Sequence, residues 1–374
     1  MSNIFPSIDA DGLLEYSVVF NDRSLNHMSK SFQEIMNYVS SSLKYVYNGN
    51  TTVIVPGGGT YAMEAVARQY ATNKKCLLVR NGWFNFRFSQ IFQMGGIPSA
   101  EIVHKAKRAG NNNDSPFSPA PIAEVVKSII ENKVDLVFAT HTETSAGVIL
   151  PDDYIKQLAD AVHSVGGMLV LDCVASGNIW VDMKSLGVDV LITAPQKGWS
   201  STPAFGIVML SELASNAIKN TKSTSFSCDL LKWLEIMQIY ENGKHAYHAT
   251  LPTDSIGQFK DILVEMQEFG LQKAQQKQQE LGKKIRQLLE NKGFKSVAAE
   301  GFKSPSVVVS YTDDKDIHNG AKFSALGMQI AAGVPLACDE GDDYQTFRIG
   351  LFGIDKLKDI DVALARFKKV IAKI

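Results

Sequence analysis

One lysine stands where a parallel sheet would place its chemistry. A β-branched apolar run ends in a turn that carries Lys197 between a glutamine and a glycine, in the stretch Val188-Asp-Val-Leu-Ile-Thr-Ala-Pro-Gln-Lys-Gly-Trp. Open α/β sheets bind ligands beyond the carboxyl ends of their strands. A lysine that is partly desolvated there loses some preference for its charged form, and its neutral amine can condense with an aldehyde. Taken alone, the stretch also fits a loop lysine that faces water.

A glycine-rich turn upstream predicts an anion site. A strand-like run breaks at Pro56-Gly-Gly-Gly-Thr60 and continues into a helical pattern. Small residues let a ligand approach the backbone, and the free amides and the dipole at a helix start favour negative charge. The turn lacks the GK[ST] ending of a nucleoside-triphosphate loop and does not match GxGxxG. A tight turn that simply needs glycine is the alternative.

An aspartate and a group of aromatic residues follow two further strands. Asp172 comes after the apolar run Met168-Leu-Val-Leu, where a carboxylate is costly unless it is paired. It could face a protonated ring nitrogen, or it could serve as a cap or as part of a buried network. The aromatics of Trp83-Phe-Asn-Phe86 could stack on a planar ligand, although such clusters more often belong to a core.

These four strand ends fit a single ligand, pyridoxal 5'-phosphate. Its phosphate would lie on the glycine turn, its ring under an aromatic side chain, its ring nitrogen on Asp172 and its aldehyde on Lys197. Each feature has an ordinary structural explanation, but their joint occurrence at one edge of a sheet is much less expected by chance.

The elements that must position these residues alternate as strand and helix. About seven strands alternate with helices over residues 51–211, which predicts a doubly wound, mostly parallel α/β sheet. We expect three parts: an N-terminal segment and helix over 1–50, a large ligand-binding domain over 51–260, and a smaller α+β domain over 261–374. The first part should contain a helix over 29–45. A long polar helix over 255–291 should lead into the last part, which should contain strands over 306–311 and 346–350, a helix over 315–326 and a closing helix from Asp359.

Composition excludes several classes of protein. The 374 residues carry 38 Lys and Arg against 39 Asp and Glu without a dense basic block, so nothing favours nucleic acid or an anionic membrane as a partner. The four cysteines are far apart and form no CxxC, which indicates neither a disulfide framework nor a zinc site. The N-terminus shows no signal-peptide pattern, and we expect a cytoplasmic protein.

The sequence resembles the class V aminotransferases, a family of fold-type I pyridoxal-phosphate enzymes. It is most similar to the branch that holds alanine:glyoxylate, serine:glyoxylate and 2-aminoethylphosphonate:pyruvate aminotransferases. The likeness runs from about Asn21 to the C-terminus. Its most specific pieces are Leu171-Asp-Cys-Val-Ala-Ser176, Gln196-Lys197, Tyr247-His-Ala-Thr250 and Phe347-Arg-Ile-Gly350.

The resemblance implies a role for each matching residue. Lys197 would be the Schiff-base lysine and proton shuttle, and Asp172 the partner of the pyridine nitrogen. Arg348 would grip the substrate carboxylate, which suits its planar fork of donors. The remaining cofactor contacts would be Gly58, Gly59 and Thr60 at the phosphate, Phe84 on the ring, Thr144 and Gln196 as hydrogen-bond partners, and Tyr247 and Thr250 reaching the phosphate of a neighbouring subunit.

The implied activity is a ping-pong transfer of an amino group. A small donor such as alanine or serine would give it up, and a 2-oxo acid such as glyoxylate or pyruvate would receive it. The reach of Tyr247 and Thr250 into a neighbouring site implies a homodimer with shared active sites.

The sequence departs from the family pattern in three places, of which the first and third leave the donor open and the second removes one hydroxyl contact to the phosphate. The residues Ile8-Asp-Ala-Asp-Gly-Leu-Leu-Glu15 stand where the family often carries Pro-Gly-Pro-Thr, and Gly58 stands where many relatives have a serine. An acidic stretch, Cys338-Asp-Glu-Gly-Asp-Asp343, precedes Arg348. Acidic residues near the entrance would disfavour a phosphonate or a second carboxylate in the substrate.

Two other readings use the same scaffold. One is a cysteine desulfurase or related β-lyase, because the gap between Cys338 and Arg348 is like the gap that follows the desulfurase cysteine. However, desulfurases carry a histidine directly before the lysine, and this sequence carries Gln196 there. A buried, small apolar role for Cys338 is the simpler interpretation. The other is a non-catalytic cofactor-binding protein, which the presence of both Lys197 and Arg348 argues against.

Overall fold

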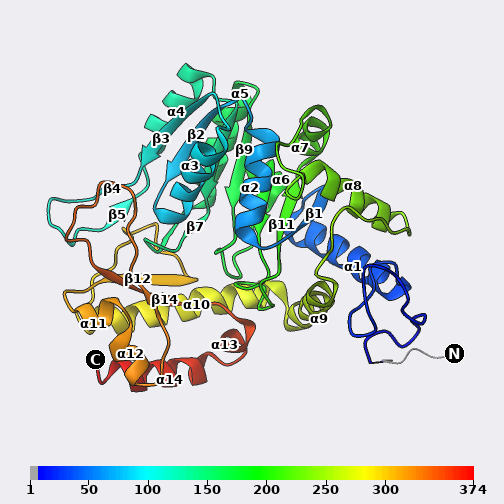
Figure 1. Ribbon diagram of the computed structural model, residues 1–374. Coiled ribbons are helices and arrows are strands. Elements are labelled where there is room, and N and C mark those ends of the chain that lie inside the picture. Colours follow the sequence, from blue (N-terminus) through cyan, green and yellow to red (C-terminus); the bar gives the residue numbers. More distant parts are fainter. Residues whose placement is uncertain (1–6) are drawn as a thin grey trace.

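A seven-stranded sheet forms the centre of the molecule. The computed structural model describes residues 7–374 (Figure 1). The strand order is β1-β11-β10-β9-β6-β2-β3. The strands are β1 (Thr51–Pro56), β2 (Lys75–Arg80), β3 (Ala100–Lys105), β6 (Leu136–Thr140), β9 (Met168–Asp172), β10 (Val190–Thr193) and β11 (Phe205–Leu210). Only β11 runs against its neighbours, β10 and β1, so the predicted mostly parallel α/β sheet is confirmed.

Helices cover both faces of this sheet (Figure 1). The helix α2 contacts β1, β10 and β11, while α3 contacts β2 and β6 and packs on α2. The helices α4 and α5 pack together, and α5 contacts β6 and β9. Their bounds are α2 (Gly59–Tyr70), α3 (Trp83–Gly95), α4 (Ile122–Asn132), α5 (Asp152–Ser164), α6 (Met183–Leu186), α7 (Glu212–Ala217), η1 (Ile218–Asn220) and α8 (Leu230–Glu241).

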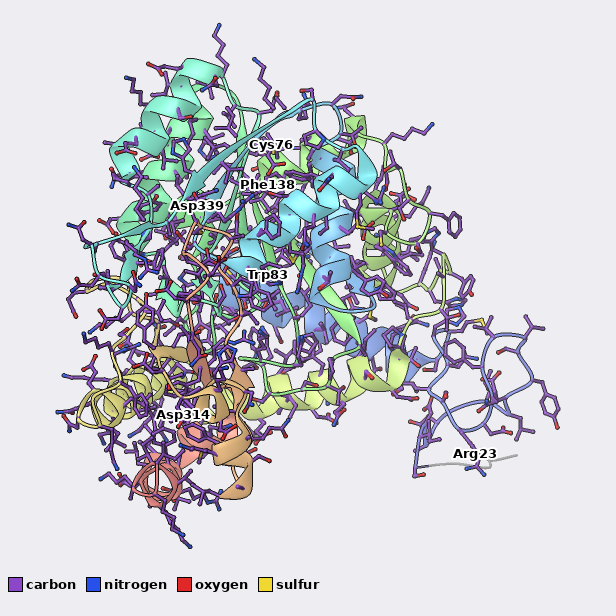
Figure 2. All side chains as sticks on the ribbon, turned by 60° about the vertical axis from the view of Figure 1, so that its left-hand side comes forward. Arg23, Cys76, Trp83, Phe138, Asp314 and Asp339 are labelled. Carbon is purple, nitrogen blue, oxygen red and sulfur yellow. The ribbon has the colours of Figure 1, made fainter. Side chains whose placement is uncertain are left out.

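The central strands are buried along their whole length. Every residue of β6, β10 and β11 is buried, which is the pattern of a sheet covered on both faces. Phe138 of β6 packs against the rings of Phe88 and Phe92 on α3, with centroid distances of 4.9 and 5.2 Å (Figure 2). Because these strands are buried on both faces, they appear in the sequence as continuous apolar runs, and the end of each run indicates the end of a strand.

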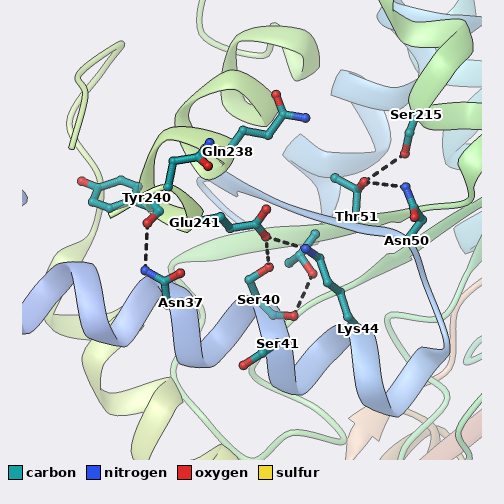
Figure 3. A network of polar contacts seen from close by, with 12 residues as sticks. Asn37, Ser40, Ser41, Lys44, Asn50, Thr51, Ser215, Gln238, Tyr240 and Glu241 are labelled. Carbon is teal, nitrogen blue, oxygen red and sulfur yellow. Dashed lines mark hydrogen bonds and ion pairs between the residues drawn. The ribbon is translucent and has the colours of Figure 1, made fainter. Parts of the chain in front are cut away.

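The helix α1 (Lys30–Tyr47) joins the N-terminal segment to the large domain. Its N-cap Ser29 accepts a hydrogen bond from the Phe32 amide. Figure 3 shows how polar contacts tie α1 to the end of α8: Asn37 Nδ2 donates to the Tyr240 carbonyl at 2.8 Å, and Lys44 Nζ lies 2.6 Å from Glu241 Oε1. The helix ends two residues later than expected.

Two helices predicted for the C-terminal part are wrong as single elements. The expected helix over 255–291 is α9 (Thr253–Phe269) followed by α10 (Leu271–Glu290), because Gly270 between them has a φ of 94°. The expected helix over 315–326 is likewise divided into α11 (Lys315–His318) and α12 (Ala321–Ala325) by Gly320, whose φ is 84°. Positive φ is a conformation that glycine adopts without strain, and it interrupts a right-handed helix.

A second sheet, in the C-terminal part of the chain that we call the small domain, lies opposite the carboxyl ends of the seven-stranded sheet (Figure 1). Its antiparallel order is β12-β14-β13. Its strands are β12 (Val307–Tyr311), β13 (Ala331–Ala332) and β14 (Thr346–Gly350), and the chain closes with α13 (Ile354–Lys358) and α14 (Ile360–Ile371). Two short pairs, β4 (Lys107–Arg108) with β5 (Phe117–Ser118) and β7 (Thr142–Glu143) with β8 (Val148–Ile149), lie in the connections of the large domain.

Some features are absent from the described chain. Within residues 7–374, no helix combines the length and the apolar character needed to cross a membrane. The same residues contain no cluster of three or more His, Cys, Asp or Glu side chains that could hold a metal ion. All four cysteines are buried and free.

Candidate active site

A cavity of about 230 Å³ lies at the carboxyl ends of the central strands. It brings together seven of the residues expected from the sequence: Gly59, Thr60, Phe84, Thr144, Asp172, Gln196 and Lys197. The other lining residues are Met63, Arg87, Thr142, Val174 and Ala175. Gly58 lies directly beside this cavity, at the N-cap of α2.

Lys197 sits in a tight turn four residues beyond β10. The turn is held by hydrogen bonds from the Ser200 amide to the Lys197 carbonyl and from the Ser201 amide to the Pro195 carbonyl. Gly198 is needed here, because a Cβ would lie 2.1 Å from the Gly177 carbonyl oxygen. Burial lowers the pKa of the Lys197 amine, and the nearby Asp172 carboxylate opposes this shift. The lysine therefore has easier access to its neutral, nucleophilic form than an exposed lysine has.

Two aromatic faces enclose the lysine amine. Its Nζ lies 5.6 Å from the ring centroid of Phe84 and 5.3 Å from that of Phe352. Phe352 follows β14 and so comes from the small domain. It was not among the residues expected from the sequence, because no local pattern tells which domain closes over the lysine.

Asp172 is the last residue of β9 and is 4% exposed. Burial raises the pKa of its carboxyl to about 6, although a 2.9 Å hydrogen bond from the Val174 amide favours the charged form. The cations Lys197 and Arg87 also favour the charged form. Bringing a ring cation to this carboxylate would add the partner that a buried charge needs.

The glycine turn presents an uncapped helix start to the cavity. The helix α2 begins at Gly59 without a side-chain hydrogen bond at its N-terminus. Gly57 and Gly58 both have positive φ, at 118° and 154°, which explains the need for glycine at these positions. The free amides and the helix dipole therefore face outward as an anion site.

Within residues 7–374, three buried polar atoms at the cavity have no hydrogen-bond partner. They are Thr142 Oγ1, Thr144 Oγ1 and Gln196 Oε1. Leaving such groups unpaired costs about 1–3 kcal/mol each. A polar planar ligand that fills the cavity would satisfy them. Pyridoxal 5'-phosphate has the required groups, so the residues present fit this cofactor.

Glu143 is a buried residue of the site that the sequence reasoning missed. Its carboxylate accepts hydrogen bonds from the amides of Phe84 and Asn85 at 3.1 Å, and also from Ser145. Burial raises the pKa of Glu143, while these hydrogen bonds oppose the shift. The carboxylate thereby fixes the start of α3, which carries Phe84. The signal was the glutamate in His141-Thr-Glu-Thr-Ser145, directly after a buried strand.

Arg348 approaches the site from β14 of the small domain. Its Nε donates to the Ala332 carbonyl at 2.7 Å, which orients the guanidinium. Burial lowers the pKa of Arg348, and the charge of Arg348 in turn lowers the pKa of Lys197, so the two cations lie within electrostatic reach. Arg348 does not line the cavity itself.

Tyr247 and Thr250 lie away from the cavity of their own chain. They occupy the loop between α8 and α9, and the Tyr247 hydroxyl lies 3.1 Å from Thr250 Oγ1. Tyr247 is 53% exposed, and its ring is 5.6 Å from that of His27 in the N-terminal segment. Neither residue lines the cavity around Lys197, so one chain alone does not bring all the expected cofactor contacts together.

Cys338 lies in a buried environment that does not suit a nucleophilic thiol. It is 5% exposed, its Sγ donates to the Arg80 carbonyl at 3.3 Å, and burial raises the pKa of the thiol to about 12. A thiol that stays protonated is a poor nucleophile. This location agrees with a buried apolar role and disfavours the desulfurase reading.

The acidic stretch after Cys338 binds neighbouring loops. Asp339 pairs with Lys105 at the end of β3, at 2.6 Å (Figure 2). Glu340 accepts the amide of Cys338 at 2.8 Å, and Asp343 accepts a hydrogen bond from Asn113. None of these carboxylates lines the cavity, so the expectation that they select against anionic substrates has no support in the geometry.

Comparison with known proteins agrees with this geometry. Residues 13–334 match the profile of the family described as aminotransferase class-V, which is most of the chain. The chain belongs to the class V aminotransferase family. This membership confirms the activity class expected from Lys197 and its surroundings.

Individual relatives are distant but cover most of the chain. The sequence is 28% identical over 319 residues to 2-aminoethylphosphonate–pyruvate transaminase of Bacillus cereus, covering 83% of this chain and 81% of that protein. It is 26% identical over 300 residues to alanine–glyoxylate aminotransferase of Rattus norvegicus, covering 79% and 67%. The crystal structure of alanine–glyoxylate aminotransferase from Nostoc superposes with a TM-score of 0.76 at 22% identity, covering 93% of this chain and 89% of that one, which establishes the fold.

Replacing Glu143 with alanine should destabilise the protein. The change leaves the amides of Phe84 and Asn85 without their acceptor in a buried place, so we expect the free energy of unfolding to fall by about 2–4 kcal/mol. Urea unfolding monitored by circular dichroism measures this change. Glu131→Ala removes an exposed carboxylate and serves as the control, with an expected change within about 0.5 kcal/mol. Equal stabilities for the two variants would show that Glu143 does not fix α3.

Proposed function

We propose that this aminotransferase uses pyridoxal 5'-phosphate to move an amino group from a small donor, such as alanine or serine, to a 2-oxo acid such as glyoxylate or pyruvate. The observation that carries the proposal is the pairing of a half-buried lysine with a buried carboxylate in one cavity, beside an uncapped helix start. The names of the relatives support this class of donor and acceptor.

Each part of the cofactor would be bound by different residues of the cavity. Lys197 would hold its aldehyde carbon, Asp172 its ring nitrogen and Phe84 one face of its ring. Gly59 and Thr60 would hold the phosphate at the start of α2. Thr144 and Gln196 have unpaired polar atoms ready for its remaining polar groups. When bound, this cofactor supplies an electron sink that stabilises negative charge at the substrate α-carbon.

Lys197 also suits the task of moving a proton. With its amine free, Lys197 would lie near the substrate α-carbon, where it could take up or return a proton. Burial lowers the pKa of Lys197, which favours the neutral amine more than in an exposed lysine. The rings of Phe84 and Phe352 lie close to this amine, at 5.6 and 5.3 Å from centroid to Nζ, and reduce its contact with water.

Arg348 would select substrates that carry an α-carboxylate. Its Nε donates to the Ala332 carbonyl, and its two terminal nitrogens, which make no hydrogen bond to the residues that the structure describes, could form a bidentate pair with a carboxylate. Because this arginine comes from the small domain, carboxylate binding would also draw that domain toward the lysine.

A homodimer would complete the site. Tyr247 and Thr250 present two adjacent hydroxyls on an exposed loop, outside the cavity of their own chain. In a symmetric dimer, each loop would reach the phosphate bound by the other subunit.

Absorbance of the bound cofactor tests the proposed reaction. With an amino donor alone, the yellow colour of the lysine-bound cofactor should be lost within a single turnover, and a 2-oxo acid should restore it. Screening small amino acids against glyoxylate and pyruvate by this change would identify the substrates. Steady-state rates should give parallel double-reciprocal plots, as ping-pong transfer requires. Intersecting plots, or sulfide release from cysteine without amino transfer, would contradict the proposal.

Mixing two inactive variants tests the shared site. Lys197→Ala lacks the amine, and the double variant Tyr247→Phe with Thr250→Val lacks the hydroxyls offered to the partner. A mixed dimer contains one site with all wild-type groups, so an equal mixture that exchanges subunits should recover about a quarter of wild-type activity. Each variant alone is the control. A mixture no more active than its components would mean that each chain completes its own site.

A further inference from the structure

We infer that Arg87 binds the phosphate group of the cofactor from within the same chain. The inference rests on the proposed function and adds a residue to which neither the sequence motifs nor the relatives gave a role. It concerns which side chain of the same chain neutralises the phosphate group, apart from the hydroxyls that a partner subunit would add.

Arg87 spans the two helix starts that meet at the cavity. It lies on α3, one turn after Phe84, and its guanidinium carbon is 5.0 Å from the centroid of that ring. Its Nη1 donates to Thr60 Oγ1 at 3.0 Å, in the first turn of α2. A phosphate on the amides of α2 would therefore meet the guanidinium directly beside it. The spacing of three residues on a helix places the ring contact and the phosphate contact on one face.

The charge of Arg87 has no carboxylate partner. Among the ion pairs formed by residues 7–374, none includes Arg87. Two acidic groups lie nearby. Glu143 accepts hydrogen bonds from the start of α3, and Asp172, whose charged form both Lys197 and Arg87 favour, would face the ring nitrogen of the cofactor. Lys197 adds positive charge within the cavity, and Arg348 adds more from outside it, within electrostatic reach of Lys197. A cavity with this surplus of cations favours an anionic ligand, and a phosphate dianion suits a planar arginine fork.

The glycine turn explains why such a cation is needed. Gly58 offers no hydroxyl, and a Cβ at this position would meet nothing within 4 Å, so no other side chain fills the place. Thr60 is the hydroxyl that remains in the turn. Because its oxygen accepts a hydrogen bond from Arg87, its own proton is free to point at a phosphate oxygen. Arg87 thus contributes a direct contact and also orients a second one.

The competing explanation is that Arg87 only supports the Phe84 ring through a cation–π contact. The two explanations differ in their dependence on the phosphate group. Pyridoxal, which lacks the phosphate but has the same ring and aldehyde, separates them. A contact with phosphate affects only pyridoxal 5'-phosphate, whereas support of the ring affects both ligands.

The experiment measures dissociation constants of the cofactor-free protein for both ligands, by tryptophan fluorescence and by absorbance. For Arg87→Gln we expect the constant for pyridoxal 5'-phosphate to rise about 10- to 100-fold, and the constant for pyridoxal to stay within about threefold. Arg87→Lys keeps the positive charge but lacks the planar guanidinium, so its dissociation constant for pyridoxal 5'-phosphate should lie between those of the wild type and Arg87→Gln. The matched control is Arg68→Gln, which removes an arginine of α2 that pairs with Glu64 outside the cavity and should change neither constant.

A second readout needs no pyridoxal ligand. Inorganic phosphate should raise the melting temperature of the cofactor-free wild type and of Arg68→Gln, but not that of Arg87→Gln. Pyridoxal binding shows that each variant is folded. If Arg87→Gln lost affinity equally for pyridoxal 5'-phosphate and pyridoxal, or lost affinity for neither, the inference would be overturned while the proposed function stayed intact. If wild type binds neither ligand, the proposed function fails and the inference fails with it.

Discussion

The structure depends on keeping an amine and a carboxylate close together in a place that is poor in water. Asp172 and Lys197 would each prefer their neutral form there, and each favours the charged form of the other. The parallel sheet makes this arrangement possible, because β9 and β10 are neighbours and both end at the same edge. Their buried strands hold the two groups at a fixed separation, and the glycine at position 198 lets the turn pass close to the Gly177 carbonyl.

Around this pair, the remaining elements supply what a planar anionic ligand needs. The start of α2 offers amides, the start of α3 offers a ring and a cation, and the small domain adds Phe352 and Arg348. Glu143 fixes the start of α3 through its hydrogen bonds, although it does not line the cavity itself. The site is thus assembled from several helix and strand termini, each fixed by packing behind it, and precise placement follows from the rigidity of the sheet.

Much of the fold and of the site could be predicted from the sequence. The features that escaped prediction have a common physical reason. Strands buried on both faces leave continuous apolar runs, so the sheet and the residues at its edge, Lys197 and Asp172, were legible. The break at Gly270 was not, because helical periodicity continues on both sides of it. Arg87 and Glu143 act through contacts with residues 27 and 58 positions away, which no local pattern reveals. The positions of Tyr247 and Thr250 in a neighbouring site, and the domain bounds, stay predictions.

The central claim is that the Lys197 amine carries the cofactor. Its most direct test is to incubate the purified protein with pyridoxal 5'-phosphate, reduce it with borohydride and locate the label by peptide mass spectrometry. The account predicts one modified peptide with the label on Lys197, and no specific label in the Lys197→Ala variant. A stable label on another lysine, or an unlabelled and colourless wild-type protein, would contradict it.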